Sequence, residues 1–370
     1  MKKGELKVRP ATSDDYPAIA SLLDRTFGKI PFEKRIKLWQ WRHDNNPAQI
    51  PEIPGFLLAE KSGQIVGVHG LTPMRVKVGD RQYHAACSCD FAIDQTARSV
   101  GMKIKLKTLS KEISSLPIST SANKPANKIT LALGGKEFIA SRRKLLKPLK
   151  ASGFIQKIVA RKVGAVGEAL ATIISILIGK PLDWILVITR YFRSFSKVAN
   201  AKIQNINQFD QRFDKLWEQV SQSYPILIVR DSLYLNWRYA NYPFSGVQQF
   251  GLFCDNELLG FAVIHNTIDE DGLSLVAILE LFVPPSEKAA FEHLLKEIIK
   301  RATQVKAHYI KAWTLVPEWE ELFTHYGFKV RDSSFSPTTY KNNTDLPNEL
   351  FTEDGNWYMS LGDGDICYYF

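Results

Sequence analysis

Hydrophobic and polar residues alternate in two stretches of this chain that lie far apart in the sequence. Residues Gly55 to Leu71, GFLLAEKSGQIVGVHGL, place two apolar runs on either side of a Lys-Ser-Gly turn. Residues Phe250 to Asn266, FGLFCDNELLGFAVIHN, do the same around Asp-Asn-Glu. Apolar runs around turn residues predict β-hairpins. Because Gly67 and Gly260 occupy the same place in the two stretches, we expect one repeated element.

A strand and an amphipathic helix are expected after each hairpin. The strands are Cys87 to Asp94 and Ala277 to Pro284, which align Asp90 with Glu280. Apolar residues spaced three and four apart then predict a helix that buries one face. They are Met102, Leu106, Leu109, Ile113 and Leu116 in the first copy, and Phe291, Leu294, Leu295, Ile298 and Ile299 in the second. A short strand, a helix and a glycine close each copy.

A ten-residue motif precedes each hairpin. It reads LWQWRHDNNP from Leu38 and YLNWRYANYP from Tyr234, with Trp, Arg, Asn and Pro at the same positions. Since the segments that follow also match, the chain is predicted to hold two copies of a β-rich α/β (α+β) domain. We interpret Trp41 and Trp237 as core anchors. The alternative is that Arg42 lines an acceptor cleft and binds an anionic substrate group.

The segment from Ala151 to Asn205 aligns with neither copy. Within it, VGAVGEALATIISILIG from Val163 is apolar almost all round, with a narrow polar stripe of Glu168, Thr172 and Ser175. It is shorter than the ~20 residues that span a bilayer. The predicted organisation is therefore a first domain at 1–150, a helical insertion at 151–205 and a second domain at 206–370. The insertion either packs on the domains as a clamp or lies in a membrane interface.

Positive charge is concentrated next to this insertion. The 370 residues carry a formal net charge of +10, which favours an anionic partner. From Lys136 to Lys162 the only acid is Glu137, so residues 142–192 are a candidate for peripheral membrane contact. The N-terminus shows no apolar signal region, and we expect a cytoplasmic protein. The four cysteines lack the spacing of a zinc site, and no metal is expected.

The link between the first strand and its helix has the chemistry of an anion site. It reads IDQTARSVGMK, from Ile93 to Lys103. A glycine lets backbone N–H groups approach a phosphate, and the N-terminus of a helix adds partial positive charge. Arg98 can add a charge-assisted hydrogen bond. The second copy has PPSEKAA at this place, with no glycine and with Glu287 where a phosphate would lie, so we interpret that site as degenerate.

These elements resemble the GNAT superfamily of acyl-CoA-dependent N-acyltransferases. VRPATSDDYPAIASLLDRTFG, from Val8 to Gly28, is similar to the first strand and helix of that family, with Ile19, Leu22, Leu23 and Phe27 on the buried face. RSVGMK is similar to its pyrophosphate loop, although Ser99 and Lys103 replace glycines. The resemblance implies two mixed-sheet domains and an acyl-CoA donor such as acetyl-CoA. The cofactor-binding residues it implies are Phe91, Ile93, Arg98, Ser99, Val100, Gly101, Met102, Lys103 and Asn123.

The resemblance breaks down at the proton donor. In many family members a tyrosine on the closing helix protonates the departing thiolate, but the matching positions here hold Thr130 and Phe323. The general acid is then another group, water, or absent. For the general base, Asp90 is the first candidate and His84 the second. Their structural alternatives are a solvated or capped strand carboxylate and a surface histidine.

The resemblance implies transfer of an acyl group to a small-molecule amine, such as an amino sugar or an envelope precursor. A second interpretation is an aminoacyl-tRNA-dependent transferase of cell-wall precursor synthesis, which would also use a basic, doubled fold. Nucleic acid is an expected partner only under that interpretation. A third is a membrane-associated scaffold in which both sites have decayed. The sequence does not choose among the acceptors.

Overall fold

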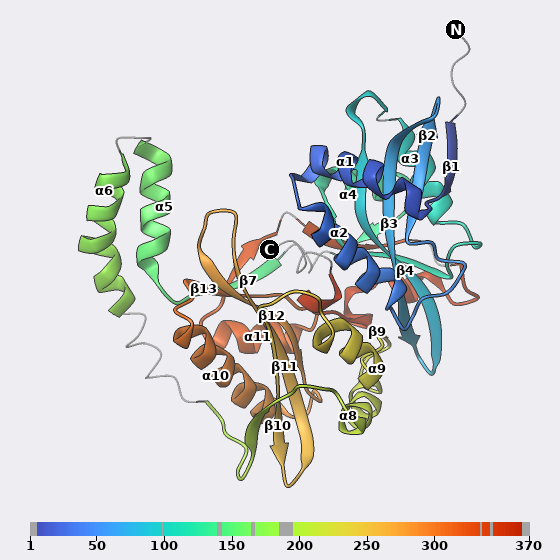
Figure 1. The fold of residues 1–370 in the computed structure, drawn as a ribbon. Coiled ribbons are helices and arrows are strands. Elements are labelled where there is room, and N and C mark those ends of the chain that lie inside the picture. Colours follow the sequence, from blue (N-terminus) through green and yellow to red (C-terminus); the bar gives the residue numbers. More distant parts are fainter. Residues whose placement is uncertain are drawn as a thin grey trace. The chain divides into compact units, whose positions relative to one another are not determined.

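The computed structural model describes residues 6–97, 99–138, 143–163, 167–184, 195–333, 335–340 and 343–364, and these form two compact units. Unit 1 consists of Met1–Arg142, Tyr224–Pro243 and Ser333–Tyr358. Unit 2 consists of Arg143–Ser223, Phe244–Asp332 and Met359–Phe370. Each unit is an α/β layer structure built on one mixed sheet (Figure 1). The units are thus discontinuous in sequence, unlike the contiguous ranges expected above.

Unit 1 is built on a nine-stranded sheet. Its main path runs in the order β1 (Leu6–Pro10), β2 (Phe56–Lys61), β3 (Gln64–Val78), β4 (Arg81–Ile93), β5 (Leu116–Asn123), β15 (Phe335–Thr339) and β6 (Lys136–Glu137). Two further strands, β9 (Ile226–Ile228) and β16 (Trp357–Tyr358), extend it from β3. The β4–β5 and β9–β16 pairs are parallel and the other pairs are antiparallel.

The longer helices of unit 1 lie between its strands in the sequence. They are α1 (Tyr16–Phe27), α2 (Phe32–Trp39), α3 (Val100–Thr108) and α4 (Lys124–Ala132). Short helical segments complete the unit: η1 (Ser13–Asp15), η2 (Gln40–Asp44), η3 (Gln95–Ala97), α9 (Ser232–Leu235), η7 (Asn236–Ala240), α12 (Asn348–Thr352) and η8 (Asp354–Asn356). Both copies of the Trp-Arg motif form π-helical turns, η2 and η7.

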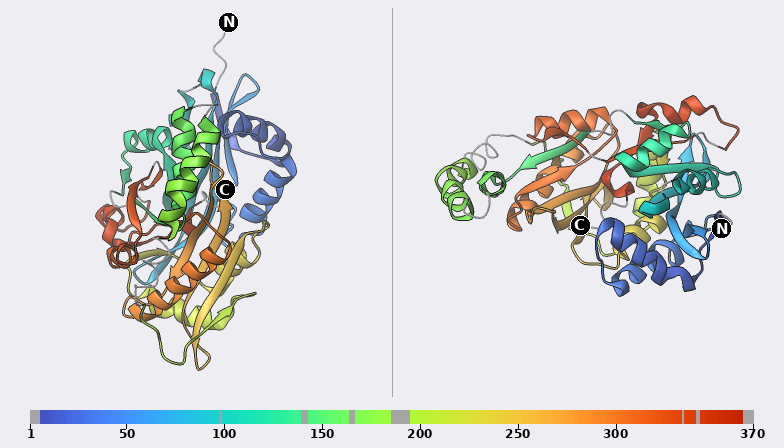
Figure 2. Two further views of the ribbon diagram at one scale, coloured as in Figure 1. Left: turned by 90° about the vertical axis from the view of Figure 1, so that its left-hand side faces the viewer. Right: turned by 90° about the horizontal axis from the view of Figure 1, so that it is seen from above.

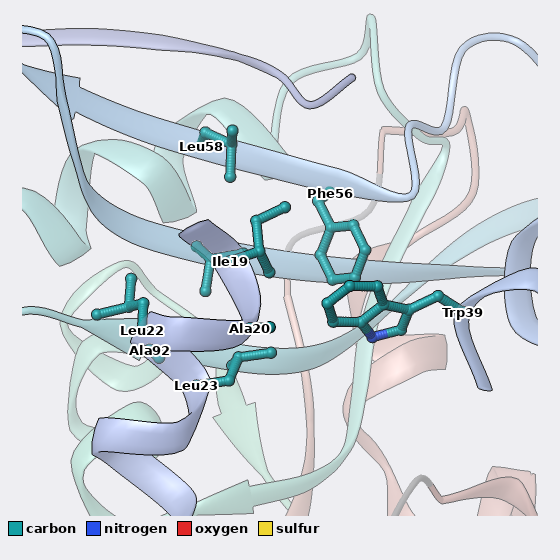
Figure 3. Close-up of a cluster of buried hydrophobic side chains, with 9 residues drawn as sticks. Ile19, Ala20, Leu22, Leu23, Trp39, Phe56, Leu58 and Ala92 are labelled. Atoms are coloured by element: carbon teal, nitrogen blue, oxygen red, sulfur yellow. The ribbon is translucent and has the colours of Figure 1, made fainter. Parts of the chain in front are cut away.

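Apolar residues of α1 form one side of the unit 1 core. Ile19, Leu22 and Leu23 are buried against β2 and β4, beside Trp39 of α2 (Figure 3). Burial of such side chains drives folding at about 25 cal/mol per Å² of apolar surface. The expectation for Phe27 was wrong, because its side chain is 51% exposed at the last position of α1.

The helix after β4 is shorter than its apolar period suggests. It ends at Thr108, although Ile113 and Leu116 continue the spacing of three and four. Both residues are buried, but from a turn and from the start of β5. The apolar spacing continues past the end of the helix because the turn that follows it packs on the same core of Ala86, Val100 and Ile104.

Unit 2 repeats the plan of unit 1 in a seven-stranded sheet. Its order is β8 (Lys202–Asn205), β10 (Val247–Cys254), β11 (Glu257–Ile268), β12 (Ser274–Phe282), β13 (Tyr309–Ala312), β7 (Arg143–Pro148) and β14 (Lys329–Asp332). Its helices are α5 (Ala151–Val163), α6 (Gly167–Ile174), η6 (Ser175–Gly179), α8 (Gln211–Ser221), α10 (Lys288–Gln304), α11 (Pro317–His325) and η9 (Leu361–Asp363).

The two β-hairpins share structural details, and these support the repeated pattern seen in the sequence. Both hairpins turn through two residues with positive φ, Ser62 and Gly63 in one and Asp255 and Asn256 in the other, as the twist of a two-residue hairpin requires. A Cβ on Gly67 would lie 2.8 Å from Ile93 Cδ1, and one on Gly260 would lie 2.3 Å from Val283 Cγ1. The glycines therefore recur because a β-branched neighbour occupies the space in each copy.

Each sheet also contains strands from the other half of the chain, namely β9, β15 and β16 in unit 1 and β7 in unit 2. In unit 1, β15 pairs with β5 and β6, and in unit 2, β7 pairs with β13 and β14. This exchange is the reason that the units are discontinuous. It also places part of the basic run, Arg143 to Lys147, in a strand of the second sheet.

Candidate active site

The first sheet opens between β4 and β5. Their parallel pairing ends at Cys87 and Ile118, although β4 continues to Ile93 and β5 to Asn123. Beyond this point the described residues form no further β4–β5 pairs. Strand edges of this kind bind extended ligands through main-chain hydrogen bonds.

A β-bulge lies on β4 beside this opening. Val68 pairs with Ala92 and Gly70 with Cys89, so His69 faces two residues, Asp90 and Phe91. Asp90 has φ of +43°, which is the left-handed region. Bulges and positive φ at a non-glycine residue are concentrated at functional sites because they redirect side chains. A register shift recurs on β11 between Val263 and Ile264, where β12 carries Glu280.

The Asp90 side chain is held by a buried ion pair. Arg42 Nη2 donates to Asp90 Oδ2, and the two side chains are 0% and 3% exposed. Removing one partner of such a pair would leave the other charge buried. The ion pair therefore links η2 to the bulge. Arg42 is buried in the interior and does not line an open cleft. The role of Asp90 as a base stays a prediction.

The structure separates the two predicted catalytic residues. His84 is exposed near the start of β4, where it pairs with Arg75. Six residues of strand place it ~20 Å from Asp90 along β4. It lies outside the segment in which β4 and β5 separate, so the two residues do not form one acid–base pair.

A buried lysine lies where the two strands separate. Lys105, on α3, is 2% exposed, and its Nζ lies 3.4 Å from Ser88 Oγ and 3.2 Å from Tyr340 Oη. The same ammonium stands 4.8 Å from the centre of the Phe91 ring. Tyr340 Oη in turn lies 2.7 Å from Thr130 Oγ1. We call Lys105, Ser88, Phe91, Tyr340 and Thr130 the Lys105 cluster.

The Lys105 cluster has an unbalanced charge. Among the described residues no carboxylate pairs with the ammonium, whose polar contacts are two hydroxyl groups. A buried charge is costly unless it is paired and hydrogen-bonded. The cluster is therefore suited to bind an anion or to stabilise negative charge that develops during a reaction.

His69 extends the cluster through the Phe91 ring, which its imidazole meets edge-on at 5.1 Å. Its Nδ1 lies 2.8 Å from Thr108 Oγ1, and its Nε2 has no hydrogen-bond partner among the described residues. Burial, aided by the nearby Lys105 charge, lowers the pKa of His69 well below its usual value of 6.5. The imidazole is therefore neutral at pH 7.

The residues proposed to hold the cofactor have different environments. Phe91 and Ile93 are half-buried at the end of β4, Val100 is buried in the core, and Ser99 and Lys103 are exposed at the start of α3. Met102 lies on α3 as well. Asn123 caps α4, because its Oδ1 accepts from Ala126 N at 3.0 Å. Arg98 lies outside the described residues.

Gly101 has a packing role that the sequence did not reveal. A Cβ at this position would lie 3.2 Å from Ile129 Cδ1 and 3.4 Å from both Ile93 and Phe91. The glycine therefore lets α3 approach α4 and β4 closely. This approach also fixes the N-terminus of α3 beside the opening, so the packing role and the anion-binding hypothesis are compatible.

One hollow of the surface lies apart from this site. A depression of about 530 Å³ is bordered by α1 and the loop to α2, with Asp24, Arg25 and Lys29 at its edge. None of its residues belongs to the Lys105 cluster or to the opening between β4 and β5. In the part of the chain that the structure describes, no group of three or more His, Cys, Asp or Glu residues could hold a metal ion.

Comparison with known families decides the class of this domain. Residues 7–114, which include the bulge, the opening and α3, match the sequence model of the acetyltransferase (GNAT) domain. Residues 7–114 are a GNAT domain. The protein is accordingly an acyltransferase enzyme. No protein of curated function matches the chain.

Two solved structures share the fold of this chain. One is a protein of unknown function from Enterococcus faecalis V583, described as a probable N-acyltransferase, and the other is a GCN5-related N-acetyltransferase from Anabaena variabilis ATCC 29413. Each is 12% identical, with a TM-score of 0.55 over 90% of this chain and 72% of its own. At this identity the likeness concerns the fold.

Sequence reasoning missed Lys105 and Tyr340 as members of the GNAT domain's site. Lys105 lies between the helix positions Met102 and Leu106, where lysine is typical of a solvated face. Tyr340 is distant in sequence and reaches the site only because β15 joins the first sheet. The one signal for Lys105 that was available in the sequence is its place on the face of α3 that packs against the sheet.

The buried histidines of the GNAT domain predict how its stability depends on pH. Burial lowers the pKa of His69 and, with Arg42 nearby, that of His43. The unfolded chain takes up these protons near pH 6.5, so the stabilisation is complete above that value and is lost as the pH falls below it. The free energy of unfolding, measured with urea between pH 6.5 and 5, should depend less on pH in His69→Asn than in the wild-type protein. Its slope against pH should be smaller by about 1 kcal/mol per pH unit.

The exposed His84 supplies the matched control for this measurement. His84→Asn makes the same substitution at an exposed position and measures what the loss of a histidine does outside the core. An unchanged slope in His69→Asn would contradict the assignment of a buried, neutral imidazole.

Proposed function

We propose that the protein transfers an acyl group from an acyl-CoA, such as acetyl-CoA, to an amine, with the reaction at the opening between β4 and β5. The observation that carries the proposal is the Lys105 cluster, which lies at the point where the GNAT domain's β4 and β5 separate. Acyl-CoA would supply the activated acyl group. The chain would supply binding, orientation and a proton.

The donor would be held by backbone groups and by the start of α3. The edge of β4 that faces β5 can hydrogen-bond an extended chain, and the N-terminus of α3, at Ser99 and Gly101, can face a diphosphate. Lys103 is exposed in the first turn of this helix and adds a positive charge. In unit 2 the corresponding α10 begins after Glu287, whose carboxylate would oppose a phosphate.

Tyr340 is the proton donor in this proposal. Thr130 occupies the position at which family members carry their tyrosine, and the Tyr340 hydroxyl bonds to the Thr130 hydroxyl. The missing phenol is thus replaced by one that arrives with β15. When the amine attacks and the carbon–sulfur bond breaks, the Tyr340 O–H would protonate the thiolate, and the proton that the amine loses would return to the phenolate and restore the phenol. Lys105, whose Nζ donates to Tyr340 Oη, would stabilise the phenolate.

The acceptor is proposed as an amine, with amino sugars and envelope precursors as the first compounds to assay. Asp90 was the first candidate for the base that takes the amine proton. Its ion pair with Arg42 favours a positioning role, in which the carboxylate fixes the bulge beside Phe91. No described contact favours the tRNA-dependent or scaffold alternatives over acyl transfer.

Isothermal titration with acetyl-CoA and longer acyl-CoAs tests the donor. Ser99→Glu should weaken binding about tenfold, because it places a carboxylate at the N-terminus of α3 as Glu287 does in α10. Gln82→Glu makes the same change of charge at the exposed start of β4 and should leave the affinity unchanged. If the wild-type protein binds none of these compounds, the proposal fails.

A further inference from the structure

The helical insertion is a short antiparallel hairpin within unit 2, formed by α5, α6 and η6. Gln156 Nε2 lies 3.4 Å from Thr172 Oγ1, and Ser175 Oγ donates to Ser152 O at 3.0 Å. Asp183 closes the hairpin, because its carboxylate accepts from the backbone N–H and the hydroxyl of Ser152 at the start of α5. The two helices run side by side in each view (Figures 1 and 2).

Small and polar residues face the inside of this hairpin. Ala171, Ser175 and Gly179 are spaced four apart, and all three are buried. A Cβ on Gly179 would lie 2.6 Å from Ser152 Cα, so the helices meet nearly backbone to backbone. Thr172 and Ser175, two residues of the polar stripe seen in the sequence, bond to α5. These two side chains therefore contact the partner helix.

Large apolar side chains face outward instead. We call them the apolar face: Ile158, Ile173, Ile176, Leu177, Ile178, Leu182 and Trp184 are between 38% and 72% exposed. In a water-exposed helix the large apolar residues point to the core. Small residues between helices with apolar residues outside are the arrangement of helices that contact lipid.

Charge indicates which kind of surface covers the apolar face. Lys157 precedes Ile158, and Lys180 follows the Ile176–Ile178 run; both lysines are exposed. The nearby carboxylate of Asp183 is engaged as the cap of α5. Trp184, the most exposed member of the face at 72%, is a residue type enriched where a membrane meets water. Apolar side chains bordered by lysines complement a bilayer with anionic headgroups.

The geometry points to an interfacial contact, and we propose that the α5–α6 hairpin docks on the surface of an anionic lipid bilayer. Among the described residues no helix is long and apolar enough to cross a membrane. The 13 residues of α5 extend for ~20 Å, less than the ~30 Å of a hydrocarbon core. The apolar face enters the headgroup boundary, and Lys157 and Lys180 meet the lipid phosphates. This inference does not depend on the proposed acyl transfer.

Flotation with vesicles tests the proposal. The purified full chain should float with phosphatidylglycerol-containing vesicles at low salt, and much less with pure phosphatidylcholine or at high salt. The triple variant Ile176→Ser, Leu177→Ser, Ile178→Ser should weaken binding at least about tenfold. Lys157→Glu and Lys180→Glu should each weaken it about fivefold or more.

Matched controls lie elsewhere in unit 2. Ile268 is 62% exposed on β11, and Lys202 is exposed on β8. Ile268→Ser and Lys202→Glu repeat the chemistry of the test variants away from the hairpin and should float like the wild-type protein. All variants change exposed residues, and circular dichroism checks that they are folded.

Two results would overturn the proposal. One is a wild-type protein that stays unbound with anionic vesicles at low salt, or a triple variant that floats as well as its Ile268→Ser control. The other is evidence that a second copy of the chain, and not a bilayer, covers the apolar face. That case would appear as a dimer in sedimentation without lipid, dissociated by the triple variant, with no flotation.

Discussion

Tyr340→Phe should lower kcat for acyl transfer about a hundredfold or more and change the KM for acyl-CoA little. The substitution removes only the hydroxyl, which lies 2.7 Å from Thr130 Oγ1 and 3.2 Å from Lys105 Nζ. A positioned proton donor contributes ~10²–10⁴ to rate. Because the phenol acts on the leaving group, its loss should destabilise the transition state and change the binding of acyl-CoA little.

Lys105→Met should have an effect of similar size, since the methionine keeps the volume and loses the charge. The double variant should be little slower than either single variant, because the two groups act as one unit. Tyr16→Phe removes a hydroxyl from α1, away from the cluster, and should leave kcat unchanged. A Tyr340→Phe enzyme that is folded and keeps the wild-type kcat for acyl transfer would exclude Tyr340 as the proton donor.

Trp41→Ala should lower the free energy of unfolding of unit 1 by about 3–5 kcal/mol. The repeated Trp-Arg motif packs against its own second copy. The Trp41 and Trp237 rings stack with centroids 5.1 Å apart, and each Nε1 donates to the backbone carbonyl of the other residue at 2.7 Å. The substitution removes a fully packed ring and both the stacking and one of these hydrogen bonds.

A double-mutant cycle isolates the contact between the two tryptophans. Trp41→Ala and Trp237→Ala should each be destabilising in urea unfolding, and the double variant should cost clearly less than their sum. Trp184→Ala, whose ring is 72% exposed, is the matched control and should change stability by less than ~0.5 kcal/mol. Strict additivity of the two core variants would show that the stacked pair contributes nothing of its own.

Local patterns predicted the elements of this fold well. Alternation and turn residues located both hairpins, and Gly67 and Gly260 marked the same close contact in each copy. The interpretation of Trp41 and Trp237 as core anchors is confirmed by their burial. These features depend on residues close in sequence, for which spacing and residue type are sufficient. Phe27 was misplaced because a helical period does not show where the core ends.

The sequence by itself determined that two similar α/β domains exist, that the first resembles an acyltransferase and that the family's tyrosine is absent. Only the tertiary structure decided that β15 and β7 exchange between the halves, which brings Tyr340 to Lys105 and Thr130. It also decided that Asp90 is bound by Arg42 and that Thr172 and Ser175 face α5, leaving the apolar residues outside. The reason is that strand pairing and ion pairing join residues far apart in the chain, and no local period encodes which strand completes a sheet or which face of a helix meets its neighbour.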